Sequence, residues 1–399
     1  MDFKQYSNLT KVVIPEKVTL VSNSKYMLSN MPNLIVADIR CDMPDMYESF
    51  SNSRSLVGHT FCGENIINMY RVYYNCVNLT DSPVCGNNVQ NMADAYRFCY
   101  KLTGSPVCGQ NVINMASAYN RCYNLTGSPV CAEKVVNFNG TYEECRNLTG
   151  HPVCGQNVTD MSSTYSDCSN LTGSPVCGNN VVNFAWTYRS CTNLTGSPVC
   201  GPNVNTMYQT YLHCTNLTGS PVCGNNVLSM YYAYGNCINL TGAPVCGPNV
   251  ETMWYTYEDC SNLTGSPVCG PNVKEMYQAY RNCYNLTGAP ACGPKVTNIR
   301  QAYWNCYNLT GNAYFYSDNI SDAMGCFTGR YNTTMLNIYI NRGTKSLTTL
   351  LDNTPYSLVG STITWSDDVT TNGYHYNTQY NIYIYPVENV HNARIANGE

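Results

Sequence analysis

The chain has 399 residues, of which 12% are charged, and its formal net charge is −4. No cluster of Lys and Arg is long enough to follow a phosphate backbone, so nucleic-acid binding is not expected. No apolar run reaches the roughly 20 residues of a membrane-spanning helix, so membrane insertion is not expected either. The segment from Met1 to Tyr6 leads into polar sequence without the apolar core of a secretory signal, and no signal peptide is predicted.

The spacing of leucines divides the chain. Leu9, Leu34 and Leu56 are 25 and 22 residues apart, whereas leucine then recurs every 23 residues from Leu79 to Leu309. A fixed period of about 20–50 residues is the signature of a solenoid, in which each repeat contacts only its neighbours. We therefore interpret residues 1–61 as irregular N-terminal capping coils and residues 62–330 as a regular stack of 23-residue coils.

Each regular repeat has an extended half and a half with helical spacing. We number its positions from the leucine, so that Leu102 is position 1 and Cys122 is position 21. Apolar residues at positions 11, 14, 18 and 21 predict one buried face of a short helix, with Asn111 as its N-cap. The half from Leu102 to Cys108 contains a proline, which cannot donate to a β-ladder, so we expect a very short strand or a polyproline-like rung. The fold prediction is an α/β solenoid.

Two columns of cysteine recur with the same period, from Cys62 to Cys292 and from Cys76 to Cys306. Zinc sites need clustered Cys or His, and these cysteines are nine and fourteen residues apart within a repeat, so no metal or other cofactor is expected. Stacked neighbours about 5 Å apart would allow some disulfides, but the eleven members of a column cannot all pair. We favour reduced, buried thiols that form structural ladders. Representative members are Cys85, Cys99, Cys108 and Cys122.

Asn-Leu-Thr sequons recur in nine successive repeats, from Asn124 to Asn308. Each matches the acceptor pattern for N-glycosylation. Coils about 5 Å apart would not leave room for a glycan on every one. We therefore expect these side chains, including those of Asn124 and Asn147, to form a structural ladder that hydrogen-bonds the turns between coils. Glycosylation is the alternative.

The repeat ends near residue 330, and the sequence texture changes. Residues 335–340 and 381–385 alternate like strands, residues 361–365 are a third candidate strand, and residues 346–351 are a candidate short helix. We predict a small β-rich C-terminal domain over residues 331–399. It would serve either as a cap or as the attachment to a larger assembly.

The repeat resembles the BspA-like, or treponemal-class, leucine-rich repeat. The best local match is Leu-Thr-Lys-Val-Val-Ile-Pro-Glu-Lys-Val-Thr-Leu-Val over residues 9–21, and Ala-Tyr-Asn-Arg-Cys over 118–122 keeps the end of the pattern. Later repeats replace the fourth-position Ile by Ser or Ala and the Pro at position 7 by Cys, and they add one residue. The resemblance covers about residues 8–330 and implies a right-handed coil stack. Its members occur in bacterial surface adhesins, protist surface proteins and bacteriophage virion proteins, and their shared motifs imply no catalytic residue.

The outward positions vary most between repeats. Positions 15, 16, 19, 20 and 22 differ freely, whereas the core positions barely change. Several of them hold Tyr, Trp or Arg, which are typical of binding hot spots, and aromatic faces also suit sugars. The alternative is that some of these rings pack against the next coil. The predicted ligand-binding residues are Trp186, Tyr208, Tyr231, Tyr232, Trp254, Tyr255 and Tyr277.

No Ser-His-Asp order, phosphate loop or paired-carboxylate motif accompanies the five scattered histidines, so no enzyme activity is predicted. The predicted role is recognition or attachment. The partner would be a protein or glycan on a cell surface, other virion proteins, or a second copy of the chain. Reduced thiols and the lack of a signal peptide favour folding in a reducing cytoplasm. Our main hypothesis is therefore a bacteriophage virion structural or host-recognition component, such as a tail- or capsid-associated fibre. The alternatives are a bacterial cell-surface adhesin and an intracellular scaffold.

Overall fold

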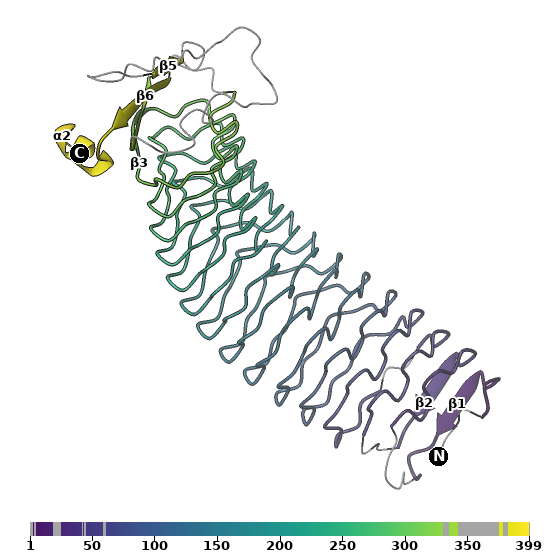
Figure 1. Ribbon diagram of the computed structural model, residues 1–399. Coiled ribbons are helices and arrows are strands. Elements are labelled where there is room, and N and C mark those ends of the chain that lie inside the picture. The colour runs from purple at the N-terminus through teal and green to yellow at the C-terminus, as the bar shows by residue number, and fades with distance from the viewer. Residues whose placement is uncertain are drawn as a thin grey trace. The chain divides into compact units, whose positions relative to one another are not determined.

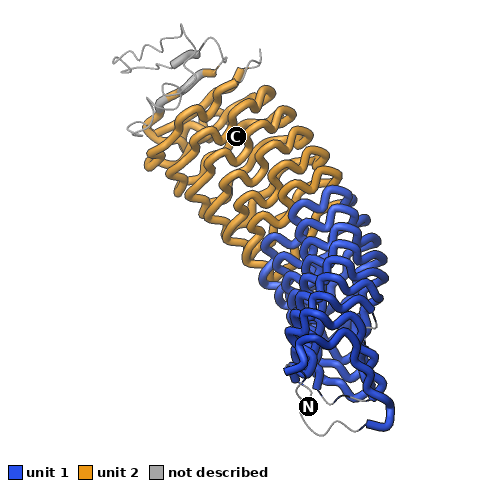
Figure 2. Tube along the Cα trace, turned by 90° about the vertical axis from the view of Figure 1, so that its right-hand side faces the viewer, with its two compact units in different colours: residues 1–196 blue, residues 197–399 orange. Residues whose placement is uncertain are grey.

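The computed structural model describes residues 3, 5–18, 25–41, 43, 45–58, 61–329, 335–341, 375–377 and 382–398. The chain falls into two compact units, unit 1 over residues 1–196 and unit 2 over residues 197–399 (Figure 2). Within each unit the chain winds through coils that lie side by side, and isolated parallel bridges join residues 23 apart (Figure 1). The repeat solenoid expected from the sequence is therefore present in each unit.

Among the described residues, regular strands occur in the first coils and from residue 311 onward. In unit 1, β1 (Lys11–Ile14) pairs in parallel with β2 (Val36–Ile39). Unit 2 contains a four-stranded sheet with the order β3-β4-β6-β5, in which β5 and β6 pair antiparallel and the other pairs are parallel. These strands are β3 (Gly311–Phe315), β4 (Leu336–Asn341), β5 (His375–Asn377) and β6 (Ile382–Val387). Helix α2 (Val390–Ala396) follows β6.

Proline explains why the intervening coils have no regular strand. Position 5 is proline in ten successive repeats, as at Pro106, whereas the corresponding residues in β1 and β3 are Val13 and Ala313. Proline has no N–H to donate to a neighbouring strand. Between the described residues 62 and 310, only single parallel bridges form, such as that between Asn91 and Asn114.

The helix predicted at positions 11–21 of each repeat is wrong. In the example repeat, residues 116–121 form turns, and the backbone is left-handed at Ser117 (φ 52°) and Arg121 (φ 62°). Left-handed residues recur at positions 16 and 20 of the regular repeats, and they interrupt an α-helix. The spacing nevertheless identifies the buried side chains correctly. These are Val112, Met115, Tyr119 and Cys122, all fully buried.

Alternate N–H groups point to the next coil rather than along the segment. Met115 N donates to Asn137 O at 2.9 Å, and Tyr119 N donates to Thr141 O at 2.8 Å. The intervening Ala118 N donates within its own coil, to Met115 O at 3.0 Å. Because alternate donors are used between coils, the continuous ladder of an α-helix cannot form.

The asparagine at position 10 also serves the stack and is not an N-cap. Asn111 Nδ2 donates to Asn87 O in the preceding coil at 3.0 Å. In unit 2, Asn249 Nδ2 donates to Asn225 O at 2.9 Å in the same way. The side chain thus stabilises the turn between coils, where a backbone ladder is missing.

Tyrosine at position 18 holds the two halves of each coil together. The fully buried Tyr119 hydroxyl donates to Val107 O at 2.8 Å and accepts from Val107 N at 3.1 Å. It thereby satisfies backbone groups of the proline-containing half, which has no strand partner. The rings also stack from coil to coil, with centroids 5.4 Å apart for Tyr96 and Tyr119, and 5.4 Å for Tyr234 and Tyr257 in unit 2.

The strands predicted at 335–340 and 381–385 are confirmed by β4 and β6. The candidate strand at 361–365 and the candidate helix at 346–351 lie outside the described residues. Helix α2 was not predicted; Asn389 caps it by accepting from Asn392 N at 3.0 Å. The three-part division of the chain at residues 61 and 330 stays a prediction. What the structure adds is that β3, part of the last coil, and β4 belong to one sheet.

We expect Tyr119→Phe to destabilise unit 1 by about 1–3 kcal/mol, because it leaves the N–H and C=O of Val107 without their partner. The matched control is Tyr123→Phe, whose half-buried hydroxyl makes only a 3.5 Å contact with Glu144 Oε2. The measurement is the urea midpoint of each purified variant. Equal midpoints for the two variants would contradict the role assigned to the position-18 hydroxyl.

Candidate recognition surfaces

Six aromatic rings gather on unit 2, and we call them the aromatic surface. Tyr208 and Tyr231 stack with centroids 4.7 Å apart, and Tyr232 and Tyr255 stack at 4.3 Å. Trp254 and Tyr277 complete the group, with centroids 6.1 Å apart. The structure therefore brings six of the seven sequence-predicted binding residues together. Trp186 lies in unit 1, where its side chain is 39% exposed.

The local backbone explains why these rings point outward. They occupy positions 15 and 16, next to the buried methionine of position 14 and the small buried residue of position 17. Tyr232 and Tyr255 are themselves left-handed, with φ of 50° and 55°. The chain therefore turns at each ring, and the side chain projects from the coil while its neighbours enter the core. Trp254 is the most exposed of the six, at 36%.

A polar network beneath the rings was missed by the sequence analysis. Glu258 is 7% exposed and pairs with Arg281 Nη1 at 2.9 Å. Gln278 Nε2 donates to the Tyr277 hydroxyl at 3.1 Å. The sequence could have predicted the ion pair, because Glu258 and Arg281 are 23 residues apart and are therefore neighbours in adjacent coils.

Gly235 makes room for the Tyr232 ring. A Cβ at this position would lie 2.9 Å from Tyr232 Cδ1 and 2.9 Å from Leu212 Cδ1. Position 19 holds a larger side chain in the other regular repeats. This glycine is therefore specific to the aromatic surface, and it acts by positioning a ring.

Burial changes the ionisation of this surface. Burial is the main cause that raises the pKa of Tyr232 to about 12, so its hydroxyl stays a hydrogen-bond donor at neutral pH. Burial also raises the pKa of Glu258, with Asp259 adding to the effect, while Arg281 and the Tyr232 hydroxyl oppose it. The surface thus presents neutral phenols next to an ion pair whose carboxylate is buried.

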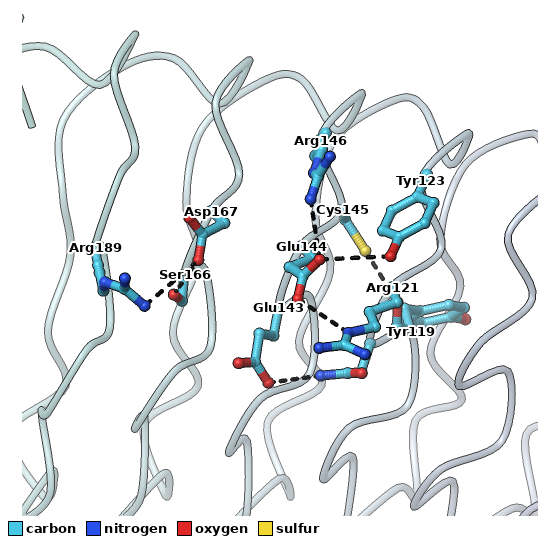
Figure 3. A network of polar contacts seen from close by, with 11 residues as sticks. Tyr119, Arg121, Tyr123, Glu143, Glu144, Cys145, Arg146, Ser166, Asp167 and Arg189 are labelled. Carbon is cyan, nitrogen blue, oxygen red and sulfur yellow. Dashed lines mark hydrogen bonds and ion pairs between the residues drawn. The ribbon is translucent and has the colours of Figure 1, made fainter. Parts of the chain in front are cut away.

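Unit 1 carries a different surface, built from arginines and carboxylates (Figure 3). Glu144 accepts from Arg121 Nε at 2.9 Å and from Arg146 Nη2 at 3.1 Å, while Glu143 accepts from Asn120 Nδ2 at 2.6 Å. Each pair of partners, except Arg146 with Glu144, joins adjacent coils. These contacts link the coils along the stack, and the arginines predicted as hot spots in this region are engaged with the protein's own acids.

The cysteine columns differ in burial. Cys99 and Cys122 are fully buried. The Cys99 thiol donates to Tyr73 O and the Cys122 thiol donates to Tyr96 O, each at 3.1 Å and each in the preceding coil. Cys85 and Cys108 are half-buried. Gly109 N donates to Cys85 Sγ at 3.2 Å. Burial raises the pKa of the Cys85 thiol to about 12 and that of Cys108 to about 11, so the reactive thiolate is scarce.

The sequon asparagines lie on one line at the turns between coils. Asn239 Nδ2 donates to Thr215 O at 2.9 Å, and Asn308 Nδ2 donates to Tyr284 O at 2.9 Å, in each case in the preceding coil. Asn124 and Asn147 occupy the same position and are exposed. At Asn239 and Asn308 the bond runs from side chain to backbone and does not join two asparagines. For Asn124 and Asn147 the ladder stays a prediction.

The described part of the chain contains no group of three or more His, Cys, Asp or Glu side chains arranged to hold a metal ion. No helix in it has the length and apolar character to cross a bilayer.

One family model, for the Kazal-type serine protease inhibitor domain, matches residues 163–186. This segment is about one coil long, and Ser163 N and Tyr165 N donate to carbonyls of the next coil at 2.9 Å. Its two cysteines, Cys168 and Cys177, are one member of each of the two columns. The match therefore covers part of the coil stack and does not delimit a separate domain.

No curated protein sequence matches the chain. A leucine-rich repeat protein from Bacteroides ovatus has a similar structure, with a TM-score of 0.50, 13% identity, and coverage of 87% of this chain and 82% of that one. A leucine-rich cell surface protein from Faecalibacterium prausnitzii has a TM-score of 0.39, 16% identity, and coverage of 77% and 87%. The first likeness supports the leucine-rich-repeat type of solenoid. No comparison supports the bacteriophage context expected from the sequence.

We expect the fully buried thiols to resist alkylation in the folded protein at pH 8, because burial raises the pKa of the column represented by Cys99 and Cys122. In denaturant without reductant, all 24 cysteines should be alkylated. Intact mass measures both conditions. A shortfall in denaturant would reveal disulfides and contradict the thiol ladders.

We expect Glu258 to make stability fall as pH rises above about 4, the ordinary range of a glutamate. Its pKa is raised in the folded state, so the folded protein binds more protons than the unfolded chain in this window, and ionisation on raising the pH costs stability. Relative to Glu258→Gln, the wild type should lose stability from pH 4 to pH 7.

The matched control is Glu251→Gln. Its hydrogen bond and ion pair with Lys274 lower the pKa of Glu251, so the wild type should be favoured over this variant as pH rises and should lose that advantage in acid. Urea unfolding at several pH values gives both differences. If the stability difference between wild type and variant changed with pH in the same direction for both variants, burial would not be what controls the pKa of Glu258.

Proposed function

We propose that the protein is a non-enzymatic recognition protein of the cell-surface adhesion type, and that it binds through the aromatic surface of unit 2. One observation carries the proposal: six rings gather where otherwise near-identical coils differ. The core columns need the same residues in every coil, whereas positions 15 and 16 face outward and are free of that constraint. Tyr and Trp bury large areas at little entropic cost, which suits a binding surface.

The polar network supports the proposal because it keeps the rings in place before a ligand arrives. Tyr232 is held by its stack with Tyr255, and Tyr277 is held by Gln278. A preorganised surface loses less conformational freedom on binding than one with mobile side chains.

A cell-surface location is compatible with free thiols. From the sequence, reduced cysteines favoured a cytoplasmic virion component. The structure buries one column fully and the other largely, and burial raises their pKa values, so the thiols are poor targets for oxidation. Reduced cysteines therefore no longer argue against an adhesin.

The test is attachment of the full chain, labelled and purified, to whole bacterial and mammalian cells. The variant Tyr231→Ala, Tyr232→Ala, Trp254→Ala and Tyr255→Ala should lose at least about thirtyfold in apparent affinity, because hot-spot residues contribute about 2 kcal/mol or more each. The matched control is Tyr284→Ala with Tyr307→Ala, which removes a stacked pair of rings at position 22. Retained attachment of the first variant, with its fold intact by circular dichroism, would overturn the proposal.

A further inference from the structure

Four rings of the aromatic surface form a closed group, which we call the four-ring group. Going around it, Tyr231 and Trp254 have centroids 6.2 Å apart, Trp254 and Tyr277 6.1 Å, Tyr277 and Tyr255 5.1 Å, and Tyr255 and Tyr231 6.2 Å. The planes of successive rings are inclined by 45°, 67°, 88° and 79°. These rings therefore do not form a parallel stack. The faces of the four rings point in different directions around one small area.

The indole of Trp254 has a fixed orientation in this group. Its Nε1 donates to Glu275 Oε2 at 3.3 Å, while the side chain remains 36% exposed. Glu275 also accepts from the Thr297 hydroxyl at 3.3 Å, so the carboxylate is itself positioned. An exposed ring is thus anchored through a hydrogen bond to an acid.

The charges in these coils favour a cationic ligand. The segment 251–281 contains the acids Glu251, Glu258, Asp259 and Glu275, and the bases Lys274 and Arg281. Both bases are paired, with Glu251 at 2.8 Å and Glu258 at 2.9 Å. Among the described residues, Glu275 and Asp259 pair with no base, so the segment keeps a negative balance beside the rings.

Several outward aromatic rings of unit 1 already lie under the protein's own guanidinium groups. Arg71 lies over Tyr70 and Tyr74, at 5.1 and 4.9 Å from the ring centroids, and Arg146 lies over Tyr123 at 5.0 Å. Within the described residues, no Lys or Arg lies over a ring of the four-ring group. The π faces that bind the protein's own guanidinium groups in unit 1 are therefore without such a partner in unit 2.

We propose that the four-ring group binds a quaternary ammonium group, displayed on a cell surface as a choline head group. This inference rests on the proposed recognition function and names its ligand chemistry. A trimethylammonium cation is attracted by several ring faces at once and needs no hydrogen-bond acceptor, which matches a group of rings with acids behind it. A neutral ligand would gain nothing from the negative balance, and an anionic one would be repelled.

In the experiment, the full chain is titrated with choline and, separately, with 3,3-dimethylbutan-1-ol, its uncharged isostere. Calorimetry measures the binding in each titration. Choline should bind at least about fivefold more tightly, which corresponds to one exposed cation–π contact. Trp254→Ala should weaken choline binding about tenfold, while Trp254→Phe keeps part of the affinity. Glu275→Gln should weaken choline binding and leave the isostere unchanged.

The matched control is Tyr284→Ala, which removes a ring that is also 36% exposed but lies outside the four-ring group; it should bind choline as the wild type does. Equal binding of choline and its isostere would overturn the inference, as would undiminished binding by folded Trp254→Ala. Tighter binding of trimethyllysine than of choline would overturn the assigned source. If cells still attach through the aromatic surface and choline does not compete, this inference fails while the proposed function stands.

Discussion

The structure depends on backbone hydrogen bonds that pass from each coil to the next. Met115 N, Ser117 N and Tyr119 N donate to carbonyls 22 residues ahead, whereas Ala118 N donates backward within its own coil. This alternation requires the left-handed residues at positions 16 and 20, although side chains other than glycine are disfavoured there by roughly 1–2 kcal/mol. The stacking of many identical coils offsets that cost, since every coil gains the same bonds from two neighbours.

The coil-to-coil bonds also determine which parts of the sequence can change. Positions that enter the core meet the same position of the next coil, as the stacked rings of Tyr119 and Tyr142 do at 5.6 Å. Any change there must suit two neighbours, so the columns stay nearly uniform. Outward positions also contact the same position of the next coil. Because they are not enclosed by the core, they can hold salt bridges, amides or aromatic rings. The two units use this freedom differently: unit 1 presents arginines paired with acids, and unit 2 presents rings.

This difference matters for function because it separates rings that are already engaged from rings that are available. Several guanidinium groups of unit 1 lie over its own aromatic side chains, whereas Trp254 of the four-ring group in unit 2 donates to the carboxylate of Glu275. Under the proposed function, a regular solenoid carries a local binding site without a cleft. The proposed site differs from the other coils in a few outward residues, and Gly235 leaves room for the Tyr232 ring.

The sequence alone was enough to predict the period, the buried columns and all six residues that meet on the aromatic surface. A period of 23 places residues i and i+23 side by side whatever the backbone does, and apolar spacing marks the inward face of either a helix or a series of turns. The same spacing could not decide between those two conformations, which is why a helix was wrongly predicted for residues 112–122. Only the tertiary structure showed that half of the N–H groups serve the next coil. It alone also showed the inclination of the rings around Trp254 and the support from Glu275, because these depend on side-chain directions that no repeat pattern encodes.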